Sequence, residues 1–342
     1  MTEHTITIAG RDDTVTAAAD QTMLDAMLRA GVWMPNSCNQ GTCGTCKLKV
    51  LCGEVDHRDS PLSTLTDQDR ADGYTLTCQA VATSDVTVEA ADGGTDAVHH
   101  PLIDFTAIVT RVDDVAQDTR IVYLRPDREF EFSAGQSVSL HVPGAPGERR
   151  QYSIASLPTD PEIELHIRRE AGGVASDQWA NGTIRVGESV ELSGPLGDFV
   201  YDPSDTDGGL LLLGGGTGIA PLKGIARAAL ADNPEREVIV YHGVRTCAYL
   251  YDQQFWADLA AAHPNFTFRP AVSREHHEGC MGYVSDRLLE DLSTCRGMTG
   301  YLCGSDRFVD GVAAAAKRRR LAPRRTFRER FTPARTRDLV AG

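Results

Sequence analysis

Four cysteines constrain this chain more than any other feature of its sequence. Three stand within nine residues, with four and then two residues between them, and the last follows after another 31 residues: Cys38, Cys43, Cys46 and Cys78. This order of spacings suits four thiolates that hold a [2Fe–2S] cluster. A loop that carries three ligands must wrap tightly and bring backbone N–H groups close to the sulfides. Gly41 and Gly44 permit the positive φ angles that such a loop needs.

Other uses of these cysteines fit less well. Cys43 and Cys46 alone would suit a redox dithiol or half of a zinc site, but a zinc site usually has two equal C-x2-C arms. A disulfide framework requires an exported chain, and the N-terminal residues lack a basic region followed by an apolar one. Residues 1–92 resemble plant-type ferredoxins, which implies a β-grasp fold (α+β) with the four cysteines as cluster ligands. Strands over 5–8, 14–17, 46–51 and 86–89 and a helix over 23–30, which Gly31 ends, fit that fold.

Length and charge narrow the class of protein. A chain of 342 residues is long for one domain, so two or three are expected. The net charge of −14 argues against non-specific nucleic-acid binding, and no apolar run is long enough to span a membrane. We therefore expect a cytoplasmic protein that binds neither nucleic acid nor membrane.

A polar, glycine-bearing stretch over 93–101 reads as a linker, and a run of short strands follows it. These strands are predicted at 105–109, 121–124, 137–142 and 163–167, with glycine and proline turns between them. The pattern indicates a small antiparallel barrel over 102–205.

Within that barrel, Arg150, Tyr152 and Ser153 form an R-x-Y-S motif, and a glycine turn leads into Gly173-Val174-Ala175-Ser176. Together they resemble the FAD-binding domain of the ferredoxin–NADP reductase superfamily, which has a six-stranded antiparallel barrel. The resemblance implies that Tyr152 supplies an aromatic platform for the flavin ring and Ser153 a hydrogen bond near its reactive nitrogen. Arg150 and the helix start at 173–176 would hold the pyrophosphate. His166, Ile167 and Arg168 follow on a strand that approaches the flavin in such domains.

From residue 206 on, the sequence alternates between strand-like and helix-like segments. This alternation predicts a doubly wound parallel sheet over 206–342. The apolar strand 210–213 runs into a glycine turn and then a helix, with five residues expected to contact a nucleotide: Gly215, Gly216, Thr217, Gly218 and Pro221. Glycines let the backbone approach a pyrophosphate, and the helix start attracts its charge. The spacing departs from the G-x-G-x-x-G fingerprint and instead resembles the pyridine-nucleotide domain of the same superfamily.

That resemblance extends to the end of the chain. Cys303 and Gly304 come at the end of a predicted strand and would lie beside the nicotinamide, with a small buried hydrophobe as the alternative interpretation of Cys303. Phe331 ends an F-x-E-x-F motif and would cover the flavin, with a role in core packing as the alternative.

Three residues bear on nucleotide choice. Arg245 and the pair Ser273-Arg274 stand where NADPH-specific relatives hold the 2′-phosphate. Here Glu275 and Glu278 follow the pair and no Lys does, which favours NADH over NADPH.

The order of the three domains resembles the reductase components of bacterial multicomponent oxygenases, in particular those of aromatic-ring-hydroxylating dioxygenases. The implied route runs from NADH to FAD to the [2Fe–2S] cluster and on to a Rieske-type oxygenase docked near the ferredoxin domain. Tyr152, Ser153 and Cys303 are the expected catalytic residues. Reductases of di-iron monooxygenases and of cytochrome P450 systems have the same domain order, so those partners stay open. A redox carrier or sensor without sustained turnover is the alternative from another class.

Overall fold

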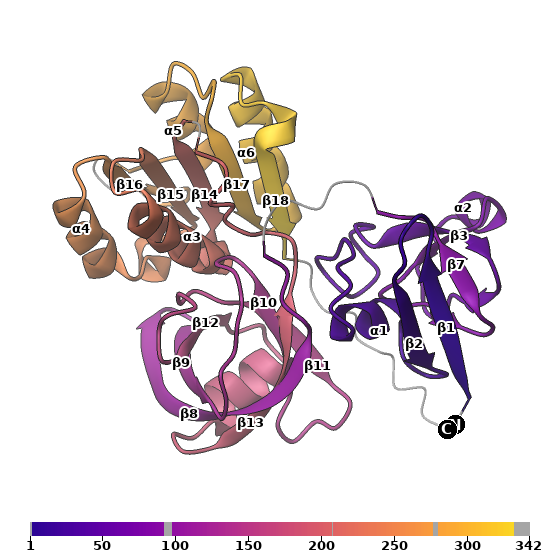
Figure 1. Ribbon diagram of the computed structural model, residues 1–342. Coiled ribbons are helices and arrows are strands. Elements are labelled where there is room, and N and C mark those ends of the chain that lie inside the picture. Colours follow the sequence, from indigo (N-terminus) through magenta and orange to yellow (C-terminus); the bar gives the residue numbers. More distant parts are fainter. Residues whose placement is uncertain (1, 92–97, 207, 276–279, 332–342) are drawn as a thin grey trace.

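A computed structural model describes residues 2–91, 98–206, 208–275 and 280–331 of the chain. The described residues form three main β-sheets, each with a hydrophobic core of its own. Figure 1 shows the first sheet beside the other two, which lie one above the other in that view. The three predicted fold types are all present: a ferredoxin domain, an antiparallel barrel and a parallel sheet covered by helices.

The first sheet has five strands in the order β2-β1-β7-β3-β5. Their bounds are Glu3–Ile8 (β1), Thr14–Ala18 (β2), Lys47–Cys52 (β3), Tyr74–Leu76 (β5) and Val86–Val88 (β7). Helix α1 (Met23–Arg29) begins after Thr22, whose hydroxyl accepts a hydrogen bond from the backbone N–H of Asp25, and its apolar residues are buried. Gly31 follows this helix with a φ of 75°, as the helix-end signal predicted. Short elements that the pattern did not predict complete the domain: β4 (Val55–Asp56), β6 (Val81–Ala82) and α2 (Asp67–Ala71).

The second sheet has six antiparallel strands in the order β11-β10-β13-β8-β9-β12. Their bounds are Ile103–Ala116 (β8), Thr119–Pro126 (β9), Ser137–His141 (β10), Arg149–Ser153 (β11), Ile163–Arg168 (β12) and Ser189–Leu196 (β13). A bridge between Ile154 and Leu165 joins the two ends of this order, so the sheet closes into a barrel. A π-helix, η1 (Val174–Thr183), packs Trp179 into the barrel core.

The third sheet has five parallel strands in the order β16-β15-β14-β17-β18. The strands are Leu210–Gly215 (β14), Val238–Val244 (β15), Phe266–Val272 (β16), Thr299–Gly304 (β17) and Thr326–Arg330 (β18). Four helices cover it: α3 (Ile219–Asp232), α4 (Gln253–Ala262), α5 (Val284–Asp291) and α6 (Asp306–Arg318). Alternate residues of β14 enter two different cores, one with α3 and α4 and one with α5 and α6, so helices lie on both faces.

Two features differ from the expectations. The F-x-E-x-F segment is an edge strand, β18, which pairs parallel to β17 and adds a fifth strand to the sheet. The linker is packed where it is described, because His99 stacks on Trp33 with ring centroids 5.0 Å apart. Residues 92–97 of the predicted linker lie outside the described residues.

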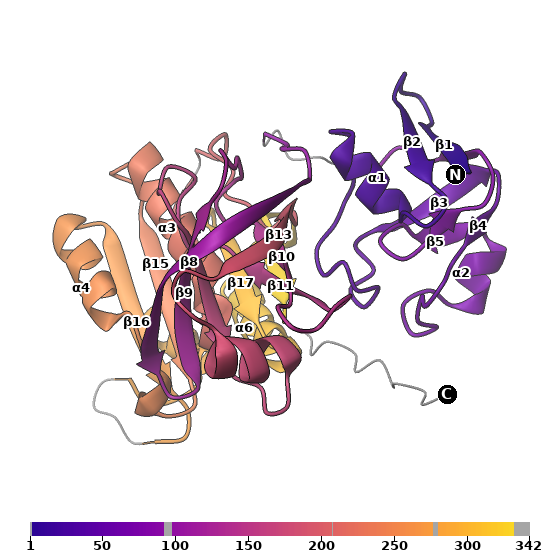
Figure 2. The same cartoon turned by 90° about the horizontal axis from the view of Figure 1, so that it is seen from below.

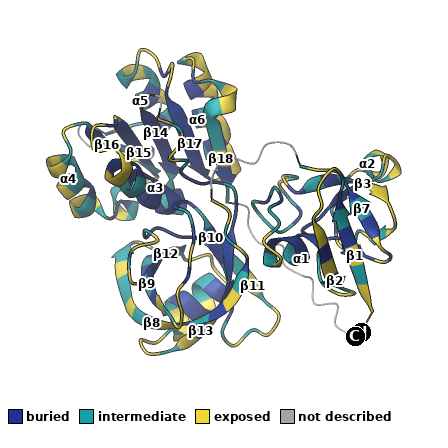
Figure 3. Cartoon of the chain, viewed as in Figure 1, coloured by how far each residue is buried: buried dark blue, intermediate teal, exposed yellow. Residues whose placement is uncertain are grey.

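Figure 3 shows the buried residues concentrated in the strands and in the inner faces of the helices. None of the helices in the described part of the chain combines the length and apolarity that crossing a bilayer requires.

Candidate cofactor sites

The cysteine loop, residues 36–46, brings its thiols together beside Cys78. The Sγ atoms of Cys46 and Cys78 lie 3.1 Å apart. The Sγ of Cys38 accepts hydrogen bonds from the backbone N–H groups of Gln40 and Cys43, each at 3.4 Å. Thr42 donates its hydroxyl to the same sulfur, also at 3.4 Å. A sulfur surrounded by N–H and O–H donors is suited to carry the negative charge of a metal-bound thiolate.

The glycines of this loop have the predicted geometry. Gly41 and Gly44 have φ angles of 75° and 78°. A Cβ at Gly41 would lie 2.9 Å from the side chain of Gln79, so only glycine fits there without a shift. The hydrogen bond from the Cys43 thiol lowers the pKa of Cys38, as the first deprotonation of a clustered thiol pair should. The four cysteines therefore fit a [2Fe–2S] cluster, with Cys43 exposed and Cys46 and Cys78 buried.

The second site lies where the barrel meets the parallel sheet. Ser153 ends β11, Cys303 lies near the end of β17, and Glu329 lies on β18. The Ser153 hydroxyl donates to Glu329 Oε2 at 3.2 Å, and the Cys303 thiol lies 3.6 Å from the same oxygen. The backbone N–H of Phe331 donates to the carbonyl of Gly304 at 2.8 Å, which places the end of the chain beside them. Ser153, predicted to lie beside the flavin, and Cys303, predicted to lie beside the nicotinamide, are thus close together in the structure.

Glu329 is the site residue that the sequence reasoning missed. Burial raises the pKa of its carboxyl to about 7, against the hydrogen bonds from Ser153 and Cys303 that lower it. Burial, and then the neighbouring carboxyl of Glu329, raise the pKa of the Cys303 thiol well above its usual value. A buried carboxyl with a raised pKa, between a hydroxyl and a thiol, marks this point as a candidate functional site. The acidic residue inside F-x-E-x-F was the available signal.

The remaining flavin candidates line the same end of the barrel. Tyr152 is half-buried, and burial raises the pKa of its phenol, which suits an apolar ring platform. The Arg150 guanidinium donates through Nη1 to Glu148 at 2.7 Å, which leaves its other donors for a phosphate. Helix η1 begins at Val174, so the amides of 174–176 are the first of a helix and lack partners within it. Ser176 accepts a hydrogen bond from the N–H of Glu170 and keeps its own O–H to donate.

The glycine turn after β14 forms a short 3-10 helix, η2 (Gly216–Gly218), that continues into α3. A Cβ at Gly218 would lie 2.3 Å from the carbonyl oxygen of Cys303, so this glycine lets the turn pack directly on β17. Gly216 has a φ of 57°, and the point where its Cβ would lie is 4.0 Å from Arg168 Nη1. The Nε of Arg168 is buried and makes no hydrogen bond within the described residues. The same Nε lies 4.0 Å from Glu170 Oε1, and the guanidinium lies over the Tyr249 ring. A guanidinium beside a glycine turn fits a nucleotide pyrophosphate.

Other predicted members of the turn have structural roles. Gly215 lies against the ring of Phe308, and Thr217 forms the middle of η2. Pro221 is the third residue of α3, a position that needs no backbone N–H.

The nucleotide-choice residues come together at the ends of β15 and β16. Ser273 donates its hydroxyl to the carbonyl of Val244, and the N–H of Arg274 donates to the carbonyl of Arg245 at 2.8 Å. Glu275 Oε2 accepts the backbone N–H of Cys247 at 2.8 Å, which holds a carboxylate next to the two arginines. Glu278 lies outside the described residues.

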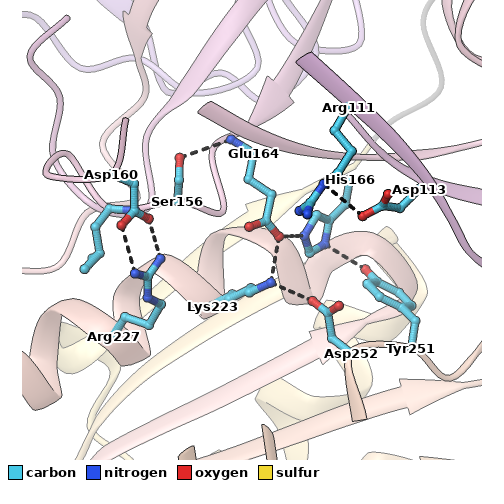
Figure 4. Close-up of polar contacts among 11 residues, drawn as sticks. Arg111, Asp113, Ser156, Asp160, Glu164, His166, Lys223, Arg227, Tyr251 and Asp252 are labelled. Atoms are coloured by element: carbon cyan, nitrogen blue, oxygen red, sulfur yellow. Dashed lines mark hydrogen bonds and ion pairs between the residues drawn. The ribbon is translucent and has the colours of Figure 1, made fainter. Parts of the chain in front are cut away.

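The side chain of His166 contacts other polar side chains of the protein, as Figure 4 shows. Its Nε2 lies 2.7 Å from Glu164 Oε1 and its Nδ1 3.0 Å from the Tyr251 hydroxyl. Lys223 Nζ of α3 lies 2.7 Å from both Glu164 and Asp252. These residues form a buried polar network, the Lys223 network, that joins the barrel to the nucleotide domain. The side chain of His166 faces that network, and Ile167 points into the barrel core, so the flavin role predicted for this strand is left to its backbone and to Arg168.

Three members of the Lys223 network are residue types that bind metal ions. Glu164, His166 and Asp252 offer ligand atoms within 4.8 Å of one another. The Lys223 ammonium already lies between the two carboxylates and supplies the positive charge there. Although burial alone would raise it, hydrogen bonds and charge from His166 and Lys223 lower the pKa of Glu164 to about 2.

Comparison with known proteins agrees with these three sites. The 2Fe-2S iron-sulfur cluster binding domain matches residues 6–83, the oxidoreductase FAD-binding domain residues 106–201, and the oxidoreductase NAD-binding domain residues 212–314. The aromatic O-demethylase reductase subunit of an Amycolatopsis species is 50% identical, over 96% of this chain and 98% of that protein. This chain belongs to the family of multicomponent-oxygenase reductases.

Further members of the multicomponent-oxygenase reductase family have the same extent. The phenol 2-monooxygenase reductase component DmpP of a Pseudomonas species is 34% identical over 97% of this chain and 95% of its own length. The crystal structure of the Amycolatopsis cytochrome P450 reductase GcoB superposes with a TM-score of 0.92 at 50% identity, covering 97% of this chain and all of that one. The chain is accordingly an oxidoreductase with a [2Fe–2S] cluster, FAD and a nicotinamide nucleotide as cofactors.

Proposed function

We propose that this chain is the NADH-dependent reductase of a cytochrome P450-type oxygenase that removes O-methyl groups from an aromatic substrate. The observation that carries the proposal is the 50% identity, over nearly the whole of both chains, to an aromatic O-demethylase reductase subunit. A P450 reductase shares the fold at a TM-score of 0.92. The phenol 2-monooxygenase reductase component is more distant, at 34% identity. The Rieske dioxygenase that the domain order first favoured is therefore the weaker choice, and the P450 alternative is preferred.

When bound, FAD would supply the conversion of a two-electron hydride donor into single electrons, and a [2Fe–2S] cluster would supply one-electron transfer. The protein contributes position and exclusion of water. Ser153, Cys303 and Glu329 enclose a buried point between the barrel and the nucleotide domain. Glu329 contributes a carboxyl at that point, and burial raises the pKa of this carboxyl to about 7. Arg168 and the turn at 215–218 hold the nucleotide phosphates.

Preference for NADH rests on Glu275. A 2′-phosphate placed near Ser273 and Arg274 would meet the carboxylate that the Cys247 N–H holds there. Like charges at such short range oppose binding, whereas a free ribose hydroxyl can donate to the carboxylate.

The outlet for electrons is the exposed side of the cysteine loop. Cys43 is exposed, and the segment 61–64 packs against the loop through a hydrogen bond from the Thr64 hydroxyl to the carbonyl of Thr42. This segment presents Leu62, an apolar side chain that is 58% exposed. The domain around it is acidic, with 15 Asp or Glu against 6 Lys or Arg in residues 1–100. An apolar centre within an acidic surface suits a partner oxygenase that has a basic docking face.

The test is reconstitution. The purified chain with NADH should reduce cytochrome c with many turnovers, and NADPH should support a slower rate at equal concentration. Mixed with a P450 O-demethylase it should support product formation, whereas a Rieske oxygenase or a di-iron hydroxylase should receive electrons poorly. Faster turnover with either of those two partners would overturn the P450 assignment. Loss of turnover with intact flavin and cluster would leave a carrier or sensor as the function.

A further inference from the structure

The cysteine loop packs against the barrel. This contact affects how the cluster site and the flavin site are positioned relative to each other. We infer that Asp198 and Gln151 are positioning residues that clamp the cysteine loop onto the flavin-binding strand β11, and that this clamp stays closed while a partner is served. The inference rests on the proposed function, because it presumes electron transfer to a partner. Its support comes from contacts that the proposed function does not use. Figure 2 shows the ferredoxin domain against the β10–β11 side of the barrel, on the side of its cysteine loop.

Asp198, just beyond β13, reaches across to the ferredoxin domain. Its Oδ2 accepts the backbone N–H of Asn36 at 2.7 Å, and its Oδ1 accepts the indole N–H of Trp33 at 3.0 Å. In the opposite direction, its own N–H donates to the carbonyl of Asn36, and the N–H of Gly197 donates to the Asn36 side-chain oxygen at 2.7 Å. Asn36 is only 3% exposed. A reciprocal set of bonds between two buried segments holds both in one orientation.

Gln151 makes the second contact, one residue before the flavin platform Tyr152. Its side-chain N–H group donates to the carbonyl of Ser37 at 2.8 Å and to the hydroxyl of Ser137 at 2.6 Å. Ser37 directly precedes the cluster ligand Cys38. Gln151, which precedes the predicted flavin contact Tyr152, therefore binds Ser37, which precedes the predicted cluster ligand.

The surrounding contacts extend this interface. Arg29 Nη2 lies 2.9 Å from Asp104 Oδ1, and the N–H of Leu102 donates to the carbonyl of Leu28. Leu196 of the barrel belongs to the hydrophobic core of the ferredoxin domain. The loop thus has two sides: the Ser37 side lies against the barrel, and Cys43 is exposed. A partner can reach the exposed side without any separation of the domains.

If the ferredoxin domain had to swing away to meet its partner, a weaker clamp would speed electron transfer through the cluster. If the domain stays in place, a weaker clamp would slow that transfer. The test compares Asp198→Ala and Gln151→Met with the control Asp127→Ala, which removes an exposed carboxylate of the barrel that contacts Thr106 and Arg128 only locally. The first readout is hydrogen exchange of the peptide that contains the Asn36 amide, in the full chain. The second is the ratio of NADH-driven cytochrome c reduction, which needs the cluster, to ferricyanide reduction, which the flavin supports.

In Asp198→Ala the Asn36 amide should exchange about tenfold faster or more, because a hydrogen bond to a charged group is lost. In both variants the cytochrome c to ferricyanide ratio should fall several-fold, with the visible absorption of the cluster unchanged. Equal exchange and an equal ratio in variants and control would overturn the inference, and so would a higher ratio, which would indicate a swinging domain. If Asp198→Ala loses its cluster, Asp198→Asn, which keeps one acceptor oxygen, replaces it and should show a smaller change of the same sign. Absence of NADH oxidation in the unaltered chain would contradict the proposed function, while the exchange measurement would still test the clamp.

Discussion

The carboxyl of Glu329 offers the sharpest quantitative test of the site between barrel and nucleotide domain. Its pKa lies at about 7 in the folded chain, against 4.5 as the ordinary value, because burial disfavours the charged form. The folded chain therefore binds this proton more tightly than the unfolded chain does. It follows that the contribution of this carboxyl to the stability is fully present below about pH 4.5 and is lost progressively as the pH rises through about 7.

The magnitude follows from the size of the shift. A difference of about 2.5 pKa units corresponds to roughly 3 kcal/mol at 1.36 kcal/mol per unit. Glu329→Gln removes the titration and keeps an oxygen that can accept from Ser153. The unfolding free energy of the variant relative to the parent should therefore rise by about 3 kcal/mol between pH 4.5 and pH 8.

The assay is urea denaturation of the flavin-free chain at several pH values, followed by near-ultraviolet circular dichroism. Glu235→Gln, an exposed carboxyl in the same domain, is the matched control and should run parallel to the parent across the range. If Glu329→Gln also ran parallel to the parent, the pKa of this carboxyl would not be raised by burial, and the prediction would be refuted. A relative loss of stability at high pH would refute the sign of the argument.

Three further outcomes test the remaining sites. Lys223→Met should destabilise the chain by about 3–5 kcal/mol, because it leaves the buried carboxylate of Glu164 and the partly buried one of Asp252 without their cation, and a thermal melt equal to that of the parent would contradict this. Cys43→Ser should lose the visible absorption of the cluster and cytochrome c reduction but keep NADH-to-ferricyanide activity, since the flavin lies in another domain; loss of both would argue against separate modules. Gly218→Ala should impair folding or nucleotide binding, because its Cβ would lie 2.3 Å from the carbonyl oxygen of Cys303, and an unchanged KM for NADH with an unchanged melt would show that the turn can yield.

Much of the domain organisation could be predicted from the sequence, and the reason is that the informative motifs are local. The cysteine spacing determines which thiols one tight loop can present. The strand, glycine turn and helix that begin at residue 210 specify their own backbone from residues close to one another in the sequence. Even the end of helix α1 at Gly31 was predicted, because a residue's tolerance of positive φ does not depend on distant contacts.

Residues whose surroundings come from distant segments could not be placed from the sequence. Glu329 lies 176 residues from Ser153, and an acidic residue between two arginines looks like a surface position until β18 joins the sheet. Lys223 is buried between two domains, which the helix pattern did not predict. His166 was predicted near the flavin, and its side chain contacts Glu164 and Tyr251.

The four candidate cluster ligands, the order of the three domains and the cofactors that each suits could thus be predicted from the sequence, since spacing and turn chemistry act within a few residues. Which of those residues face each other became clear only from the folded chain. The meeting of Ser153, Cys303 and Glu329, and the seat of the cysteine loop on Asp198 and Gln151, arise from packing between separately folded units. Such packing depends on the shape and burial of whole surfaces, which no local pattern records.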